Sequence, residues 1–338
     1  MVLVTGGTGF LGAHLLMEIC TQGEKLRALK RLSSDLDFVK FIFSYYNKSN
    51  LFENIEWVDG DILDIHSLLP AMQGVEHVYH CAATVSFSGK KSKKLLENNI
   101  SGTSNIVDAA LEAGVKKLCY VSSIAVLGKD EIISDEILWD TNEKHSAYAD
   151  SKYKAEQEIG RGMAEGLDAI IVRPSVIIGP WKPNNGMGVL FSKIENGLKY
   201  YTSGSSAYID VRDVASAMTK LMDSSEKNDS YIISSENLSY RELFTMIAKN
   251  LNKPAPQHCA SRFMTGLAWR CYAVKDFLTG KDSGFNKIIA EISQSNSKYS
   301  NKKLLETLSF SYIPIKESLS NISKFNQFLS DENYEKNN

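Results

Sequence analysis

The sequence has 338 residues, of which 43% are hydrophobic and 23% are charged, and its formal net charge is −2. This length favours about two domains, and the balanced charge gives no reason to expect a nucleic-acid partner. No apolar run reaches the roughly 20 residues that cross a bilayer, so we expect no integral membrane segment.

Five cysteines, an odd number, are scattered along the chain without the spacing of metal ligands. Cys81 and Cys119 lie in or beside apolar, strand-like runs. This pattern predicts reduced thiols in a cytoplasmic protein and no metal site.

The first predicted elements are a strand, a glycine-rich turn and a helix. The apolar run Val2–Val4 precedes the turn, and apolar residues at helical spacing follow it. Glycines in such a turn let the backbone approach a pyrophosphate at the positive end of the helix. Glycine-rich turns also occur without a ligand, but the flanking strand and helix favour a dinucleotide site formed by Thr5, Gly6, Gly9, Phe10, Leu11 and Gly12.

Strands and helices continue to alternate through the first half. A longer connection, 33–53, contains a helix-like stretch at Phe38–Tyr46. Further strands are predicted at Lys25–Leu29, Ile55–Val58, His77–His80, Lys117–Val121 and Ala169–Val172. This alternation predicts an α/β fold, a Rossmann-type doubly wound parallel sheet.

The pattern becomes less regular after Pro174. Ser239, with Glu242 three residues later, forms a capping box that begins a helix. Short strands at Lys199–Tyr201 and Tyr231–Ile233 and a helix at Val211–Met222 are also predicted, and the rest is mostly helical.

Two regions are therefore expected. Residues 1–175 form an NAD(P)-binding Rossmann domain, with 203–223 packed back on it, and 176–330 form a smaller, mostly helical substrate-binding region. Within the second, the segment 263–278 is amphipathic and aromatic. It could rest on a membrane surface, form a dimer face or cover the substrate pocket, and we favour the pocket.

Tyr148 and Lys152 lie four residues apart, on one face of a predicted helix. A nearby ammonium lowers the pKa of a tyrosine and makes it a usable acid or base. About one such pair is expected by chance. The second instance, Tyr299 with Lys303, has no strand end shortly upstream, so we interpret it as solvated helix surface.

Serines at a strand end distinguish the Tyr148–Lys152 pair from the Tyr299–Lys303 pair. Ser122 and Ser123 follow the strand Lys117–Val121, and ligands bind beyond the carboxyl ends of such strands. A serine there could hydrogen-bond a substrate oxygen, although for these two serines on their own ordinary turn capping is the favoured explanation.

The end of the second strand is basic. Arg31 stands where a binder of unphosphorylated ribose usually has an acidic residue, with Lys30 and Ser33 beside it. Arg31 suits a 2′-phosphate, which favours NADP(H), with NAD(H) possible. The alternative is a solvated basic edge.

Taken together, the motifs resemble the extended branch of the short-chain dehydrogenase/reductase superfamily, strongest from 1 to about 215. The resemblance rests on Thr5–Gly12, Gly60-Asp61-Ile62, His80-Cys-Ala82-Ala83, Asn99–Asn105, Ser123 with Tyr148 and Lys152, Arg173–Pro180 and Tyr208–Ala215. Such members bind NAD(P) and a small-molecule substrate, and many form homodimers.

The resemblance implies a role for each matching residue. Tyr148 is the general acid/base, Lys152 lowers its pKa and binds ribose hydroxyls, and Ser123, in better register than Ser122, orients the substrate oxygen. Other cofactor contacts are implied for Asp61 and Ile62 at the adenine, and for Ala82, Ala83, Pro174 and Val176.

The strand end and the Val-Ser-Ser segment are most similar to dihydroflavonol-reductase-like and 3β-hydroxysteroid-dehydrogenase-like members. This implies reversible, NADP(H)-linked reduction of a ketone or aldehyde on a fairly apolar molecule. One alternative is a nucleotide-sugar epimerase or dehydratase with a tightly bound cofactor, for which Lys182, Arg212 and Arg262 are candidate diphosphate ligands. Another is a non-catalytic NADP(H)-binding sensor.

Overall fold

A computed structural model describes residues 1–338 except 87–91, 129, 138, 184, 280–284 and 333–338. Its centre is a seven-stranded sheet in which every pair of neighbours is parallel, in the order β10-β6-β5-β4-β1-β2-β3. The strands are β1 (Val2–Thr5), β2 (Leu26–Lys30), β3 (Ile55–Asp59), β4 (His77–His80), β5 (Lys117–Val121), β6 (Ala169–Pro174) and β10 (Asp229–Ile233). The predicted doubly wound sheet is confirmed.

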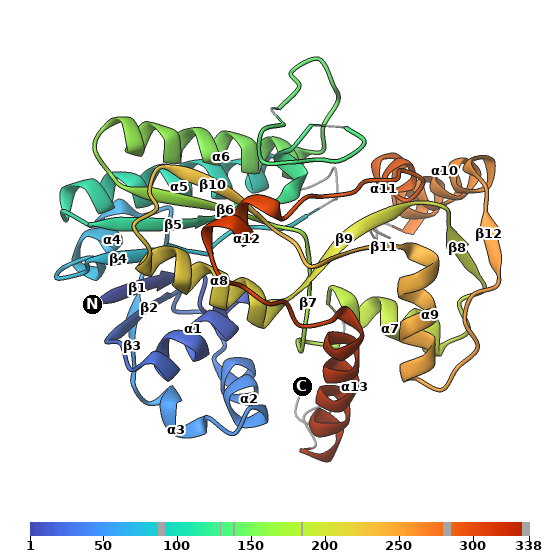
Figure 1. Ribbon diagram of the computed structural model, residues 1–338, viewed down its shortest axis with the longest axis horizontal. Helices are drawn as coiled ribbons and strands as arrows, with labels where there is room; N and C mark the ends of the chain where they lie inside the picture. The colour runs from blue at the N-terminus through green and yellow to red at the C-terminus, as the bar shows by residue number, and fades with distance from the viewer. Residues whose placement is uncertain (87–91, 129, 138, 184, 280–284, 333–338) are drawn as a thin grey trace.

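Helices cover both faces of this sheet (Figure 1). One apolar core joins the sheet to α1 (Phe10–Gln22), α2 (Asp37–Tyr45) and α8 (Val211–Asp223). A second core lies under α4 (Ile65–Ala71), α5 (Ser92–Glu112) and α6 (Ala147–Ala164). The short helix α3 (Ser49–Phe52) and the turn η2 (Ile124–Val126) complete this half.

The order of the strands reverses at β1. From β1 the chain adds β2 and β3 on one side and β4, β5 and β6 on the other. Ligands of open α/β sheets bind at such a switch point, beyond the carboxyl ends of the strands. The β1–α1 turn and the segment after β4 therefore border the expected crevice.

The last strand of the sheet comes from the second half of the chain. The sequence predicts a strand at Tyr231–Ile233, but within the substrate-binding region. In the structure β10 pairs with β6, from Asp229 opposite Ile170 to Ile233 opposite Pro174. The helix α8 provides the parallel crossover that brings it there, because it packs on α1 and on the sheet.

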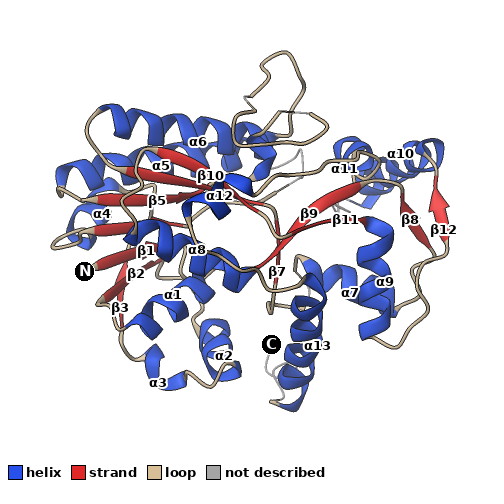
Figure 2. Cartoon of the chain, viewed as in Figure 1, coloured by secondary structure: helices blue, strands red, loops and turns tan. Residues whose placement is uncertain are grey.

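Except for α12 (Lys302–Thr307), which packs against β10, the remaining elements form a region beside the sheet (Figure 2). Its strands make a three-stranded sheet, β11-β9-β7, and a pair, β12-β8. The bounds are β7 (Val176–Ile178), α7 (Met187–Glu195), β8 (Tyr200–Thr202), β9 (Ser205–Asp210), β11 (Glu236–Ser239), α9 (Tyr240–Asn250), β12 (His258–Ala260), α10 (Arg262–Thr279), α11 (Lys287–Ile292) and α13 (Ile315–Asp331). The predicted capping box is present, since the Ser239 hydroxyl accepts from the Glu242 amide and the Glu242 carboxylate accepts from the Ser239 amide.

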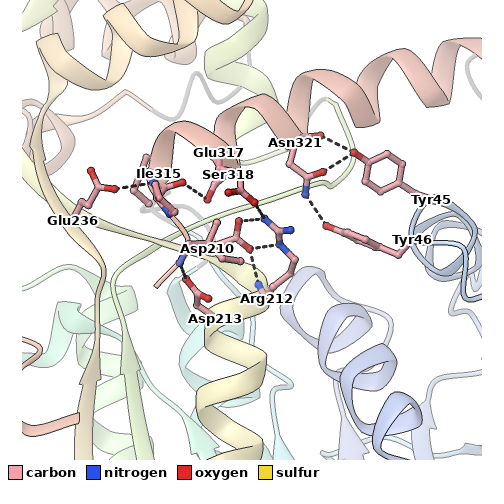
Figure 3. Close-up of polar contacts among 12 residues, drawn as sticks. Tyr45, Tyr46, Asp210, Arg212, Asp213, Glu236, Ile315, Glu317, Ser318 and Asn321 are labelled. Carbon is pink, nitrogen blue, oxygen red and sulfur yellow. Dashed lines mark hydrogen bonds and ion pairs between the residues drawn. The ribbon is translucent and has the colours of Figure 1, made fainter. Parts of the chain in front are cut away.

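The C-terminal helix α13 ties the two regions together (Figure 3). Its Asn321 accepts a hydrogen bond from the Tyr45 hydroxyl at 2.6 Å and donates one to the Tyr46 hydroxyl at 2.8 Å. On the other side, the Ile315 amide donates to Glu236 of β11.

One expectation about this region is wrong. Tyr299 does not lie on a solvated helix surface: it forms a β-bridge with Ile133 and packs against the cluster around Val126 and Ile232. Burial raises the pKa of its hydroxyl.

Candidate functional site

The glycine-rich turn is packed so closely that two of its glycines admit no side chain. Gly6 has a φ of +73°, and a Cβ there would lie 2.6 Å from the Ala82 nitrogen. A Cβ on Gly12 would lie 2.1 Å from the Gly6 oxygen. The turn therefore brings the backbone of β1 against the segment after β4 and holds α1 directly behind it.

The N-terminus of α1 is open to an anion. Gly9 is its N-cap, without a capping side chain, and the first turn has no acidic residue. The first amide groups of a helix lack intrahelical partners and carry partial positive charge. This arrangement fits the pyrophosphate of a dinucleotide.

A buried row of hydrogen bonds fixes the ends of β1 and β4. The Thr103 hydroxyl donates to the Asn99 carbonyl, so it accepts from His80 Nε2 at 3.1 Å. His80 Nδ1 then accepts from the Thr5 hydroxyl at 2.7 Å, which itself accepts from the Ala82 amide. Burial, with Lys152 nearby, lowers the pKa of His80 to about 3, so the imidazole is neutral. His80 and Thr103 both belong to motifs of the family resemblance, the one with Thr103 resembling a helix segment that supports the active site, but neither side chain has an individual role in the prediction.

Ile62 is held at the rim of the site by α5. The Asn105 side chain donates to the Ile62 carbonyl at 2.9 Å, and a Cβ on Gly102 would lie 2.5 Å from Ile62 Cδ1. The Asp61 carboxylate accepts from the Leu63 amide and so shapes the turn after β3. Both residues lie beyond β3, where an adenine site is expected.

Ser123 and Tyr148 meet beyond β5. The Ser123 hydroxyl accepts from the Ala125 amide at 3.2 Å and lies close enough to the Tyr148 hydroxyl to lower its pKa. Burial raises the pKa of Tyr148, and Ser123 partly opposes this. Ser122 lies beside them with its hydroxyl buried and without a partner among the described residues.

Lys152 is buried one turn along α6 from Tyr148. Its Nζ donates to the Val121 carbonyl at 2.6 Å and lies 4.5 Å from the centre of the Tyr120 ring. Burial lowers the pKa of Lys152 to about 8, while the charge of Glu156 opposes the fall. The expected lowering of the Tyr148 pKa by Lys152 is not seen, because burial dominates and Ser123 is the group that lowers it.

Two further contacts, which the sequence analysis missed, position α6. Glu156 forms a partly buried, bidentate ion pair with Arg173 of β6, with distances of 3.0 and 2.8 Å. The Asn99 side chain donates to Ser151 Oγ at 2.9 Å, and Ser151 donates to the Tyr148 carbonyl. These contacts connect the helix that carries Tyr148 to β6 and to α5.

Asn99 also holds the segment after β4. Its carbonyl oxygen accepts from the Thr84 amide and its nitrogen donates to the Thr84 carbonyl. Ala82 and Ala83 precede Thr84, and Ala83 is exposed. On the next strands, Pro174 ends β6 and Val176, also exposed, begins β7.

Of the two cationic side chains at the end of β2, Lys30 and Arg31, only the first forms an ion pair with another described residue. Lys30 is bonded to Asp59 of β3, whereas Arg31 is exposed and forms no ion pair with a described residue. Most of the predicted residues follow β1, β2, β3, β4, β5 or β6, which are all strands of the one parallel sheet, whereas Tyr148 and Lys152 lie on α6 and Val176 begins β7. No group of three His, Cys, Asp or Glu suited to a metal occurs in the part of the chain that the structure describes.

The fold and this set of residues define a dinucleotide-binding α/β protein of the extended short-chain dehydrogenase/reductase type. A family model described as the NAD dependent epimerase/dehydratase family matches residues 2–234. The chain therefore belongs to this family, whose members are NAD(P)-dependent oxidoreductases or epimerases.

Two sequence relatives are named as reductases, and a solved structure shares the fold. The chain is 36% identical over 264 residues to a Synechocystis protein provisionally assigned as a dihydroflavonol 4-reductase, covering 75% of this chain and 74% of that one. It is 26% identical over 282 residues to cinnamoyl-CoA reductase 1 of Petunia hybrida, covering 77% and 80%. Its fold matches the UDP-glucose 4-epimerase of Thermotoga maritima with a TM-score of 0.76 at 18% identity, covering 96% and 98%.

Proposed function

We propose that this protein is an NADP(H)-dependent reductase that interconverts a ketone or aldehyde and its alcohol on a fairly apolar small molecule. The observation that carries the proposal is the placement of Ser123, beyond β5, beside Tyr148 of α6, where Ser123 acts to lower the pKa of the Tyr148 hydroxyl, with Lys152 buried one turn further along α6. Sequence similarity to proteins named as reductases supports this class of reaction over others in the family.

The residues of this site fit the cofactor. The tightly packed turn at Gly6 and Gly12 suits the pyrophosphate, as does the uncapped N-terminus of α1 at Gly9. Arg31 suits a 2′-phosphate. Bound NADPH supplies the hydride. The other residues proposed to contact it are Thr5, Phe10, Leu11, Asp61, Ile62, Ala82, Ala83, Tyr148, Lys152, Pro174 and Val176.

Tyr148 acts as the acid in the direction of reduction. Because its pKa is raised, the phenol keeps its proton at neutral pH and donates it to the substrate oxygen. The Ser123 hydroxyl orients that oxygen. Lys152 keeps a positive charge below pH 8 and binds the ribose hydroxyls.

Replacing Tyr148 by Phe tests this role. We expect Tyr148→Phe to abolish turnover of a panel of hydrophobic ketones while the Kd for NADPH, followed by cofactor fluorescence, changes little. Tyr153→Phe is the matched control, because Tyr153 is on the same helix and its ring stacks on Trp139, a contact that Phe retains. Unchanged turnover in Tyr148→Phe would contradict the assignment.

Replacing Arg31 tests the choice of cofactor. We expect the wild-type protein to bind NADPH more tightly than NADH, and Arg31→Asp to lose or reverse that preference, since Asp repels a 2′-phosphate and accepts from a 2′-hydroxyl. Isothermal titration with both cofactors measures this. Equal Kd values in the wild-type protein, or an unchanged preference in the variant, would refute the preference for NADP(H).

The epimerase alternative needs cations for a substrate diphosphate. Arg212, one candidate, is bonded through two nitrogens to the buried Asp210, and Lys182, another, lies over the Phe38 ring. These contacts favour the reductase. Mass spectrometry of ligands that co-purify with the protein discriminates further, because a retained, non-exchanging cofactor would favour an epimerase.

A further inference from the structure

The helix α10 (Arg262–Thr279) presents a large apolar face to solvent. Only Thr265 is buried among its residues. Five apolar side chains are strongly exposed: Phe263 (81%), Leu267 (55%), Val274 (59%), Phe277 (86%) and Leu278 (76%). Their spacing of four, seven, three and one residues places them along one side of the helix. Figure 1 shows α10 beside α11, at the end of the molecule far from β1.

None of these five side chains lines the pocket that Tyr272 of α10 forms with residues of α7. Side chains with such exposed fractions project away from their own chain, so the favoured expectation for the segment 263–278, a cover for the substrate pocket, does not account for them. Monomeric proteins rarely expose a contiguous apolar surface of this kind without a partner.

The charges on α10 indicate what that partner is. Arg270 lies seven residues after Phe263 and four before Val274, hence on the apolar face. Arg270, Lys275 and Arg262 are all exposed, whereas the one carboxylate of the helix, Asp276, is partly buried. The exposed side of α10 therefore combines apolar and cationic groups, although the whole chain has a net charge of −2.

We propose that α10 docks on a lipid surface containing anionic headgroups. Phe263, Leu267, Val274, Phe277 and Leu278 enter the boundary between headgroups and acyl chains, and Arg270 and Lys275 lie at the phosphates. A helix that lies in the interface is consistent with the finding that no helix among the described residues is long and apolar enough to cross a membrane. The docking does not depend on the reaction proposed above.

A second copy of this chain fits the face less well. A two-fold contact between α10 helices would bring the cations of one copy against those of the other, with no exposed carboxylate of α10 to compensate. Anionic phosphates supply the missing charge complementarity.

Co-sedimentation of the full chain with lipid vesicles tests the proposal. We expect binding to vesicles of phosphatidylcholine with phosphatidylglycerol, weakened by salt, and at least about tenfold weaker binding to phosphatidylcholine alone. The double change Phe277→Ser with Leu278→Ser should abolish binding, and Arg270→Glu should weaken it about tenfold. Ile132→Ser, at an apolar side chain of 59% exposure outside α10, should bind as the wild type does.

Three outcomes would overturn the proposal. The first is a wild-type chain that does not sediment with anionic vesicles, and the second is equal binding to vesicles without anionic lipid. The third is a dimer, found by light scattering, that the Phe277→Ser, Leu278→Ser variant converts to monomer, which would assign the face to a second copy. All variants should keep the wild-type melting temperature, since the changed side chains are exposed.

Discussion

Asp210 and Asp213 stand at the start of α8, and their pKa values move in opposite directions (Figure 3). Burial raises the pKa of Asp210, but the bonds from Arg212, at 2.9 and 2.8 Å, outweigh it and the net pKa is lowered. Asp213 accepts a hydrogen bond from the Ile313 amide, and burial raises its pKa to about 7. Asp213 thus destabilises the fold when it is ionised.

The sign of this effect predicts how Asp213→Asn behaves. Between the usual pKa of 3.8 and about 7, the folded state holds a proton that the unfolded state releases, so stability falls as the pH rises through this window. Asn keeps the bond to the Ile313 amide without a charge. We therefore expect the Tm of Asp213→Asn to exceed that of the wild-type protein by an amount that grows from pH 5 to pH 8.

Asp210→Asn is the control for that experiment. It loses the ion pair with Arg212, so its Tm should fall most at neutral pH and less in acid, the opposite trend. A difference between Asp213→Asn and the wild-type protein that does not vary with pH would contradict a raised pKa at Asp213.

Residues in local patterns could be predicted, and those that depend on distant partners could not. Tyr148 and Lys152 share a helix face by their spacing, and Ser123 follows a strand. In contrast, the Thr5–His80 bond joins residues 75 positions apart and the Glu156–Arg173 pair joins two different elements. The raised pKa of Tyr148 also depends on burial by the folded chain, which spacing does not encode.

At the scale of elements, apolar runs between helical segments were sufficient to place the strands. The sequence predicts six of the seven strands as part of the parallel sheet, and the predicted ends of each lie within two residues of the ends in the structure. The seventh, β10, was predicted as a strand but not as a neighbour of β6, since its partner is fixed by the α8 crossover. The prediction for Tyr299 was wrong for a related reason. Its backbone pairs with Ile133, and this long-range contact cannot be inferred from the spacing between Tyr299 and Lys303.

The tight packing of α1 against its own turn predicts opposite results for two glycine substitutions in helices. Gly12→Ala should abolish NADPH binding and cost about 1–3 kcal/mol of stability, because the new Cβ has no room beside the Gly6 oxygen. In α6, a Cβ added at Gly160 would meet no described atom within 4 Å, so Gly160→Ala should stabilise by up to about 1 kcal/mol. Urea unfolding measures the stability of both variants, and NADPH titration measures their cofactor affinity. Tight NADPH binding by Gly12→Ala would contradict the assignment of the glycine-rich turn to the pyrophosphate.

At the scale of the whole molecule, the C-terminal helix is part of the main core. Phe325 of α13 is fully buried, with its ring centre 5.9 Å from that of Phe38 and 4.9 Å from that of Tyr45. The same core includes α1, α8 and β10. The two regions are therefore expected to unfold together.

Phe325→Ala tests this coupling. The loss of a buried aromatic ring should lower the free energy of unfolding by about 3–5 kcal/mol, in a single transition seen alike by circular dichroism and by tryptophan fluorescence. Phe277→Ala, at an exposed ring, should leave that free energy nearly unchanged. Two separate transitions in Phe325→Ala would mean that α13 detaches alone.

The pairing of β10 with β6 has a consequence during synthesis of the chain. After β6 leaves the ribosome, its outer edge has no partner until residues 229–233 emerge. A nascent chain, or a fragment ended at residue 175, presents Ile170, Ile171 and Val172 as an open apolar strand that other molecules can extend. The family match itself ends at residue 234, just past β10. We therefore expect that a fragment must extend at least to the end of β10 to avoid aggregation. A fragment that ends after β6 should aggregate.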